Sequence, residues 1–164
     1  MSVHFAQASY PLPVSRRLLS ARYTLAAFFI IIVLAQLFAF SKLGATIQAL
    51  VPMFSLRACQ VTATVAVVLE VATLPGLLIV ALSPLARVLS RIAGPLVLAL
   101  WYGLVYCGIR TAHVPNSGLL GSDVRVTADF WTLLAVMIIF VITCAIQYFD
   151  IRAQGVQLRK NPTK

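Results

Sequence analysis

The sequence predicts an all-α integral membrane protein, built as a bundle of four transmembrane helices with both termini in the cytoplasm. The 164-residue chain is 61% apolar and only 10% charged, and its mean hydropathy is +0.97. A chain of this composition has too little polar surface to cover a soluble globule. Its charged residues also separate long apolar runs, and the basic residues are divided unevenly between the segments that connect these runs.

The apolar runs define the expected spanning helices, which are residues 23–41, 58–86, 92–109 and 130–149. A helix needs about 20 residues to cross about 30 Å of hydrocarbon. Helices also satisfy their own backbone hydrogen bonds in lipid, whereas membrane barrels use shorter alternating strands. We therefore expect an N-terminal segment 1–22, a transmembrane domain 23–149 and a basic tail 150–164, multi-pass in a plasma or energy-transducing membrane.

The basic residues predict the orientation. Nine of the 13 lysines and arginines fall on the side of the two termini: Arg16, Arg17, Arg22, Arg87, Arg91, Arg152, Arg159, Lys160 and Lys164. The positive-inside rule places this side in the cytoplasm. The same charge favours lipids with anionic head groups as partners. No basic face outside the membrane is interleaved with aromatics, so nucleic acid is not an expected partner.

The first and second connections carry local signals. In the first connection, apolar residues recur at spacings of three and four, at Leu43, Ile47, Val51 and Phe54. This pattern predicts a short amphipathic helix that lies in the membrane interface and is interrupted at Pro52. In the second connection we expect Ser83 and Pro84 to close the second span and Gly94 and Pro95 to lie near the start of the third.

The third connection, residues 111–129, is rich in turn formers, and we expect it to be the most accessible place for a partner on the outer side. Several aromatic residues lie toward the helix ends and are expected to anchor in the membrane interfaces; they are Trp101, Tyr102, Tyr106, Trp131 and Tyr148.

Glu70 is a lone carboxylate within the otherwise uncharged second span. Placing an ionisable group there costs roughly 2 to 3 kcal/mol on insertion scales. Since burial away from water disfavours the ionised form, we expect a protonated Glu70 that faces the protein interior. It is the candidate functional residue, either as a neutral carboxyl that locks helix packing or as a carboxyl that carries a proton or contacts a quinone.

Four groups are candidate hydrogen-bond partners for Glu70. Thr143 lies at a comparable depth on the fourth span, whereas Gln36 and Tyr102 lie nearer the outer face. The carbonyl of Val71 is the fourth candidate, because Pro75 has no N–H to donate to it.

The cysteines and histidines give weaker signals. Cys59, Cys107 and Cys144 form no CxxC pair, which does not favour a thiol relay, and a disulfide between Cys59 and Cys107 remains open. His4 and His113 lie outside the spans, so neither a bis-histidine haem nor a metal site is expected. Gly103 and Cys107 form a small-xxx-small pair that is expected to pack closely against another helix.

With these elements in place, the chain resembles the DoxX-like family of small four-helix membrane proteins across residues 16–149. The resemblance is carried by the basic, leucine-containing segment Arg16-Arg17-Leu18-Leu19, the sequence Phe38-Ala39-Phe40-Ser41-Lys42-Leu43, and Leu69-Glu70 in the second span. It implies a subunit associated with membrane redox chemistry, as in thiosulfate to quinone oxidoreductases.

Two function classes follow. The first is an accessory subunit, not catalytic alone, that braces a larger redox or energy-transducing membrane complex and shapes a lipid or quinone site. The second is a quinone-linked oxidoreductase component in which Glu70 transfers the proton. In both, the expected partners are other membrane subunits and lipids, and any quinone or lipid would be shared with a partner, because the chain alone offers no cofactor ligands.

Overall fold

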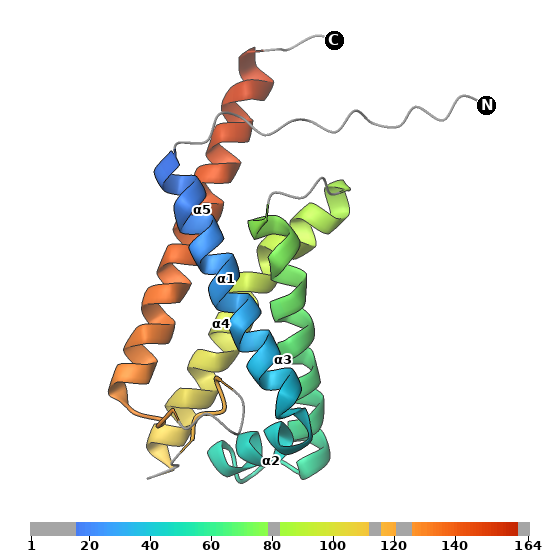
Figure 1. Ribbon diagram of the computed structural model, residues 1–164, viewed down its shortest axis with the longest axis vertical. Helices are drawn as coiled ribbons and strands as arrows, with labels where there is room; N and C mark the ends of the chain where they lie inside the picture. Colours follow the sequence, from blue (N-terminus) through green and yellow to red (C-terminus); the bar gives the residue numbers. More distant parts are fainter. Residues whose placement is uncertain (1–15, 79–82, 112–115, 121–125, 161–164) are drawn as a thin grey trace, which may run out of the picture.

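The computed structural model describes residues 16–78, 83–111, 116–120 and 126–160. The described residues form five helices and no strands. The helices are α1 (Arg16–Phe38), α2 (Phe40–Leu50), α3 (Leu56–Leu77), α4 (Pro84–Arg110) and α5 (Phe130–Lys160). The start of α1, the end of α3, the start of α4 and the end of α5 lie at one end of the bundle, here called the terminal end, and α2 lies at the opposite end (Figure 1).

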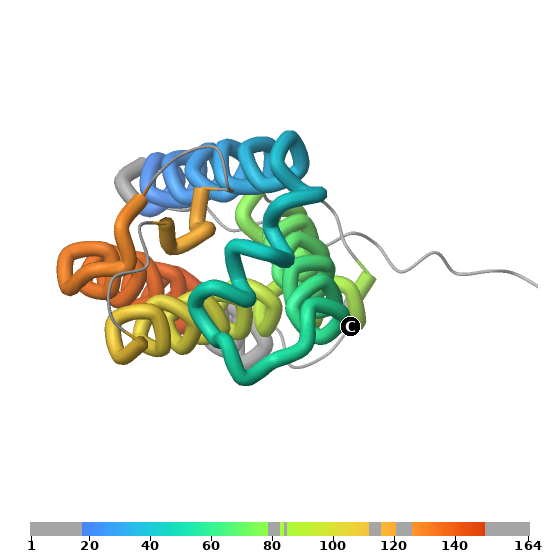
Figure 2. The backbone as a smooth tube through the Cα atoms, turned by 90° about the horizontal axis from the view of Figure 1, so that it is seen from below, coloured from blue at the N-terminus to red at the C-terminus, as the bar shows by residue number. Residues whose placement is uncertain are grey.

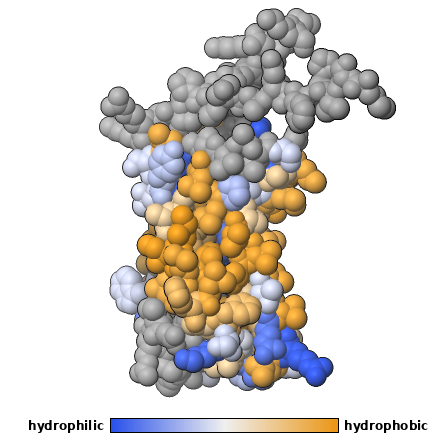
Figure 3. Space-filling model, turned by 45° about the vertical axis from the view of Figure 1, so that its right-hand side comes forward, coloured by the Kyte–Doolittle hydropathy of each residue, from blue (hydrophilic) through white to orange (hydrophobic). Residues whose placement is uncertain are grey.

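The predicted all-helical fold with four spans is confirmed. Four helices are long and apolar enough to cross a membrane, over Leu18–Phe38, Leu56–Leu77, Leu85–Arg110 and Phe130–Phe149. Hydrophobic side chains gather across the middle of the face seen in Figure 3, and hydrophilic ones lie toward its ends. This pattern suits a molecule whose middle lies in hydrocarbon and whose ends lie in the polar head groups. The helices extend into the predicted flanking segments, since α1 begins at Arg16 and α5 continues to Lys160.

The boundary between the second and third spans differs from the prediction. Helix α3 ends at Leu77, and Ser83 with Pro84 begins α4 instead of closing the preceding helix. The Ser83 hydroxyl accepts a hydrogen bond from the Ala86 backbone N–H at 3.3 Å, and proline is well suited to the first helical position, where its missing N–H has no partner to lose. Pro95 consequently lies well inside α4 and not near its start.

Helix α2 occupies the predicted amphipathic segment, but its apolar face is covered by protein. Leu43, Ile47 and Leu50 are fully buried, because α2 packs against α3 and α4. Large apolar side chains are exposed at the first residue of the helix, Phe40, and beyond its end, at Met53 and Phe54. Helix α2 therefore closes one end of the bundle, with its apolar face turned toward the other helices.

The bundle is organised around α3 and α4. Helix α3 contacts α1, α2 and α4, while α5 packs mainly on α4. Helices α3 and α4 come close together at Gly76, whose backbone N–H donates to the Ser90 hydroxyl at 2.8 Å. That hydroxyl donates in turn to the Thr73 carbonyl at 3.1 Å. The predicted close-packing position Gly103 has no heavy atom within 4 Å of where its Cβ would be. Close packing is therefore provided by Gly76 and not by Gly103.

Candidate functional site

Glu70 is a buried carboxyl held by two neutral donors from two other helices. Its side chain is 1% exposed. Glu70 Oε1 accepts a hydrogen bond from Trp101 Nε1 on α4 at 2.8 Å and another from Gln36 Nε2 on α1 at 3.1 Å. One oxygen atom of α3 therefore joins α1, α3 and α4 in the interior of the bundle.

Gln36 extends this network to the connection between α4 and α5. The Gln36 side chain is fully buried, and its Nε2 also donates to the backbone carbonyl of Leu119 at 3.0 Å. Both amide hydrogens of Gln36 are thus used, one for Glu70 and one for the connection.

The segment 116–120, here called the plug, lies inside the ring of helices when the bundle is viewed from the α2 end (Figure 2). Ser117, Gly118 and Leu119 are buried, and Gly118 has a φ of +73°, a conformation that favours glycine. The Asn116 side chain accepts from the Gly118 N–H at 2.9 Å and so stabilises the turn. The described part of the third connection is therefore a buried cover for the Glu70 network, and the prediction that it is the most accessible partner site is wrong for these residues.

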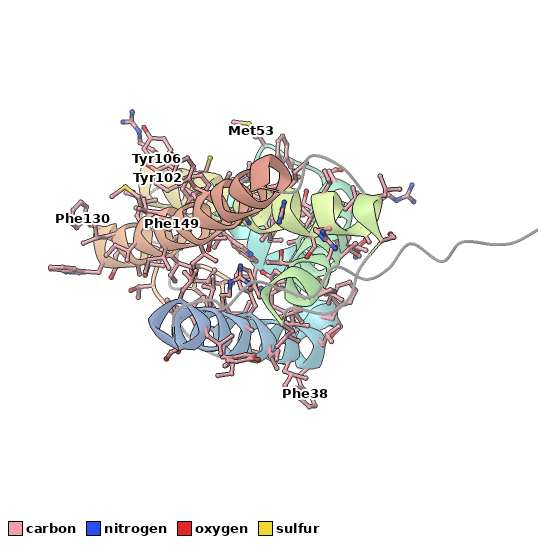
Figure 4. All side chains as sticks on the ribbon, turned by 90° about the horizontal axis from the view of Figure 1, so that it is seen from above. Phe38, Met53, Tyr102, Tyr106, Phe130 and Phe149 are labelled. Atoms are coloured by element: carbon pink, nitrogen blue, oxygen red, sulfur yellow. The ribbon has the colours of Figure 1, made fainter. Side chains whose placement is uncertain are left out.

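Of the candidate partners predicted for Glu70, the structure brings Gln36 to the carboxyl and places the others elsewhere. The Thr143 hydroxyl donates to the Ile139 carbonyl of its own helix at 2.8 Å. Tyr102 is 39% exposed and points away from the bundle, together with Tyr106 (Figure 4). The Val71 carbonyl makes no described hydrogen bond with Glu70; its exposed side chain lies on the outer face of α3.

Trp101 is the site residue that sequence reasoning missed. We expected an aromatic anchor at a helix end, but the indole is 1% exposed and donates to Glu70. In the predicted span 92–109, Trp101 is nine residues from the start and eight from the end, so its depth could have been counted along the chain. With the start of α4 at Pro84, Trp101 lies well inside the helix, about 25 Å from its first residue. The indole N–H of a tryptophan at that depth needs a hydrogen-bond partner. This requirement was the feature of the sequence that could have identified Trp101 as a partner of Glu70.

Two oxygen atoms at the site have no hydrogen-bond partner among the described residues. They are Glu70 Oε2 and Gln36 Oε1, both fully buried. A buried acceptor left without a donor costs about 1 to 3 kcal/mol. The pair is therefore suited to receive a proton on Glu70, a water molecule or a ligand hydroxyl.

The remaining sulfur and metal candidates do not join the site. Cys59, Cys107 and Cys144 are free thiols, so the disulfide left open by the sequence is not formed. Within the described part of the chain, no three histidine, cysteine, aspartate or glutamate side chains group together as a metal site would require.

Comparison of the chain with protein-family models, with curated proteins and with solved structures gives no match.

Proposed function

We propose that this protein is an accessory subunit of a larger membrane complex, in which Glu70 braces the fold of a small helical module. The observation that carries the proposal is the double hydrogen bond to Glu70 Oε1 from Trp101 and Gln36. Glu70 lies deep in the bundle and beneath the plug, and two neutral donors bind one of its oxygen atoms. Such hydrogen bonds between helices stabilise their packing.

The outer surface of the bundle supports an accessory role. Only 22% of the apolar window of α5 is buried within the chain, against 44% for α4. Helix α5 exposes a row of apolar side chains to lipid or to another chain, at Met137, Ile138, Val141 and Ile142. The resemblance to DoxX-like proteins adds the expectation that the larger complex carries out redox chemistry.

The proposal is tested by purifying the tagged chain in mild detergent with two variants of Glu70. Glu70→Gln keeps the shape and an acceptor oxygen for Trp101 and Gln36, so co-purifying chains and thermal stability should be retained. Glu70→Leu removes the acceptor and leaves two buried donors unpaired, which should cost about 2 to 5 kcal/mol and reduce recovery of the complex. A wild-type chain that purifies alone and carries out quinone-dependent turnover would contradict an accessory role.

A second candidate function is proton transfer to a reduced quinone. It is favoured by the two partnerless oxygen atoms, Glu70 Oε2 and Gln36 Oε1, which could accept the hydroxyl of a quinol. In this alternative a partner chain supplies the electrons, and protonated Glu70 gives its proton to the reduced quinone oxygen. Glu70→Gln would then abolish turnover while the complex still assembles, an outcome opposite to the one expected for a brace.

A further inference from the structure

The hydrogen-bonding roles of the atoms around Glu70 are fixed by neighbours that can only donate or only accept. The indole Nε1 of Trp101 can only donate, so Glu70 Oε1 acts as an acceptor. The Leu119 carbonyl can only accept, so the atom of the Gln36 amide that lies 3.0 Å from it is the nitrogen. The same nitrogen donates to Glu70 Oε1 at 3.1 Å. These contacts leave one oxygen atom on each of Glu70 and Gln36 to be accounted for.

The two remaining oxygen atoms, Glu70 Oε2 and Gln36 Oε1, complement each other. Both are buried and have no hydrogen-bond partner among the described residues. Covalent geometry places each of them about 2.2 Å from one end of the hydrogen bond between Gln36 Nε2 and Glu70 Oε1. Two acceptors cannot bond to each other, but a protonated carboxyl has one O–H to donate. A proton on Oε2 would therefore satisfy both oxygen atoms with a single hydrogen bond.

The helices packed against Glu70 bring no charged side chain to it in the described part of the chain. Measured along each helix, the nearest charged residue is about 21 Å from Gln36 on α1, about 14 Å from Trp101 on α4 and about 20 Å from Glu70 on α3. These residues are Arg22, Arg110 and Arg57, and the charged residue of α2 is the exposed Lys42. The phenol of Tyr102 points away from the bundle (Figure 4). A carboxylate would thus be buried without a cation, which is costly, whereas the neutral acid fits its neutral neighbours.

We propose that Glu70 and Gln36 form a cyclic acid–amide pair, in which the protonated carboxyl and the amide each donate to the other, and that this pair is a proton-dependent latch on the plug. Loss of the proton to water leaves two acceptor oxygen atoms facing each other, so the amide turns both of its N–H groups toward the carboxylate. The Leu119 carbonyl then loses its donor, and the plug loses this bond to α1. The latch rests on the bracing role proposed for Glu70 and adds that protonation controls the brace.

Glu70→Gln separates a latch from a passive brace. A glutamine at position 70 offers an oxygen atom to Trp101 and Gln36 and an N–H to the Gln36 oxygen, so it imitates the protonated carboxyl and has no proton to lose. The plug should therefore stay closed at every pH in this variant. Gln36→Leu removes the amide that joins Glu70 to Leu119 and should leave the plug open at every pH.

Thiol labelling of the purified chain in detergent measures the plug. Ser117→Cys places a thiol at a plug position that is 0% exposed, and Met53→Cys gives an 85% exposed reference at the same end of the bundle. The ratio of the two labelling rates, after subtraction of labelling in the unmodified chain, cancels the effect of pH on the thiol itself. We expect this ratio to rise by up to about tenfold per pH unit where Glu70 loses its single proton, and to stay constant in the Glu70→Gln background.

Infrared spectroscopy tests the acid–amide pair directly. At neutral pH the wild type should show the C=O stretch of a protonated carboxyl, and Glu70→Gln should remove it. Absence of this band would overturn the proposal and indicate that a water molecule donates to the two oxygen atoms.

The latch would also be overturned by a labelling ratio that changes equally with pH in both backgrounds, or that stays constant with Glu70 up to the highest pH at which the protein remains folded. If Ser117→Cys does not fold, hydrogen exchange of residues 116–120, corrected for the intrinsic rate at each pH, makes the same comparison between the wild type and Glu70→Gln. Failure of the bracing role is recognised separately, because Glu70→Leu would then leave stability and co-purifying chains unchanged.

Discussion

At the scale of single residues, the position of the Glu70 carboxyl depends on donors that other helices bring to it. Trp101 and Gln36 are 31 and 34 residues away in the sequence. Both donate to the same oxygen atom, so the loss of either leaves Oε1 bound from one side only. The indole is the shorter of the two contacts, and it comes from the most buried spanning helix.

Trp101→Phe should therefore destabilise the protein by about 1 to 3 kcal/mol, because it removes a buried donor and some packed volume. The change can be measured by heating the protein with a thiol-reactive fluorophore and recording the temperature at which the buried Cys59 thiol becomes labelled. Trp131→Phe is the matched control, since Trp131 is 73% exposed and should shift stability by no more than about 0.5 kcal/mol. Equal effects of the two substitutions would show that the Trp101–Glu70 hydrogen bond is not stabilising.

Asp129 is a second residue with a specific electrostatic role, at the start of α5. The backbone N–H of Thr132 donates to its carboxylate at 2.8 Å, and the Thr127 hydroxyl donates at 2.8 Å. These hydrogen bonds, the first of them above all, hold the pKa of Asp129 below its ordinary value. Because the pKa is lowered in the folded state, the stabilisation is present above the ordinary aspartate pKa of about 4 and is lost as the pH falls through the lower, folded value.

We expect the first turn of α5 to lose amide protection as the pH is lowered below about 4. Hydrogen exchange at Thr132 and Leu133, corrected for the intrinsic rate at each pH, would measure this loss. In Asp129→Asn the side chain still caps the helix but does not ionise, so protection there should become almost independent of pH. A wild type with the same protection at pH 3 and pH 6 would count against this role of Asp129.

At the scale of elements, the close contact between α3 and α4 requires that position 76 be a glycine, because a side chain there would collide with α4. A Cβ there would lie 2.6 Å from the Ser90 Oγ, the atom that accepts from the Gly76 N–H. An added methyl group must displace the Ser90 hydroxyl, which also bonds to Thr73. At this point in the α3–α4 interface, one glycine and one serine form a polar contact at close range.

Gly76→Ala should destabilise the protein by about 1 to 3 kcal/mol through overpacking. Gly103→Ala makes the same chemical change inside α4, where no atom lies within 4 Å. It should be neutral or stabilise by up to about 1 kcal/mol through helix propensity. Unfolding temperatures of the two variants in the same detergent would test the difference, and a larger loss for Gly103→Ala would contradict this account of the interface.

At the scale of the whole molecule, the four spans bring the start of α1 and the end of α5 to the same end of the bundle (Figure 1). Most of the basic residues belong to this terminal end by sequence, including Arg22, Arg87 and Arg91. The opposite end is closed by α2 and the plug. The two ends thus differ in charge and in construction, which suits a protein with one orientation in its membrane.

We predict that the terminal end is cytoplasmic. In intact cells, a membrane-impermeant maleimide should label Met53→Cys, because Met53 is 85% exposed at the α2 end, and should not label a cysteine appended after Lys164. Lysed cells should show labelling at both positions. The unmodified chain, whose Cys59 is buried, gives the background. Labelling of the appended cysteine in intact cells, with Met53→Cys protected, would reverse the orientation.

The sequence alone determined the fold class, the number of spans, the helical segment before Pro52 and the unusual status of Glu70. These properties depend on composition, on local periodicity and on the cost of a charge in an apolar run, which can all be read along the chain. The sequence also placed Gln36 among the candidate partners of Glu70, because the depth of Gln36 in the membrane could be counted along the first span.

Only the tertiary structure decided which side chains face Glu70. Thr143 and Trp101 both lie within spans, but the rotation and register of each helix turn Trp101 toward the carboxyl, whereas the Thr143 hydroxyl bonds to its own helix. Tertiary packing likewise folds the plug inward over Gln36 and covers the apolar face of α2. Rotation and register arise from contacts between residues far apart in the chain, and these contacts leave no periodic pattern in the sequence.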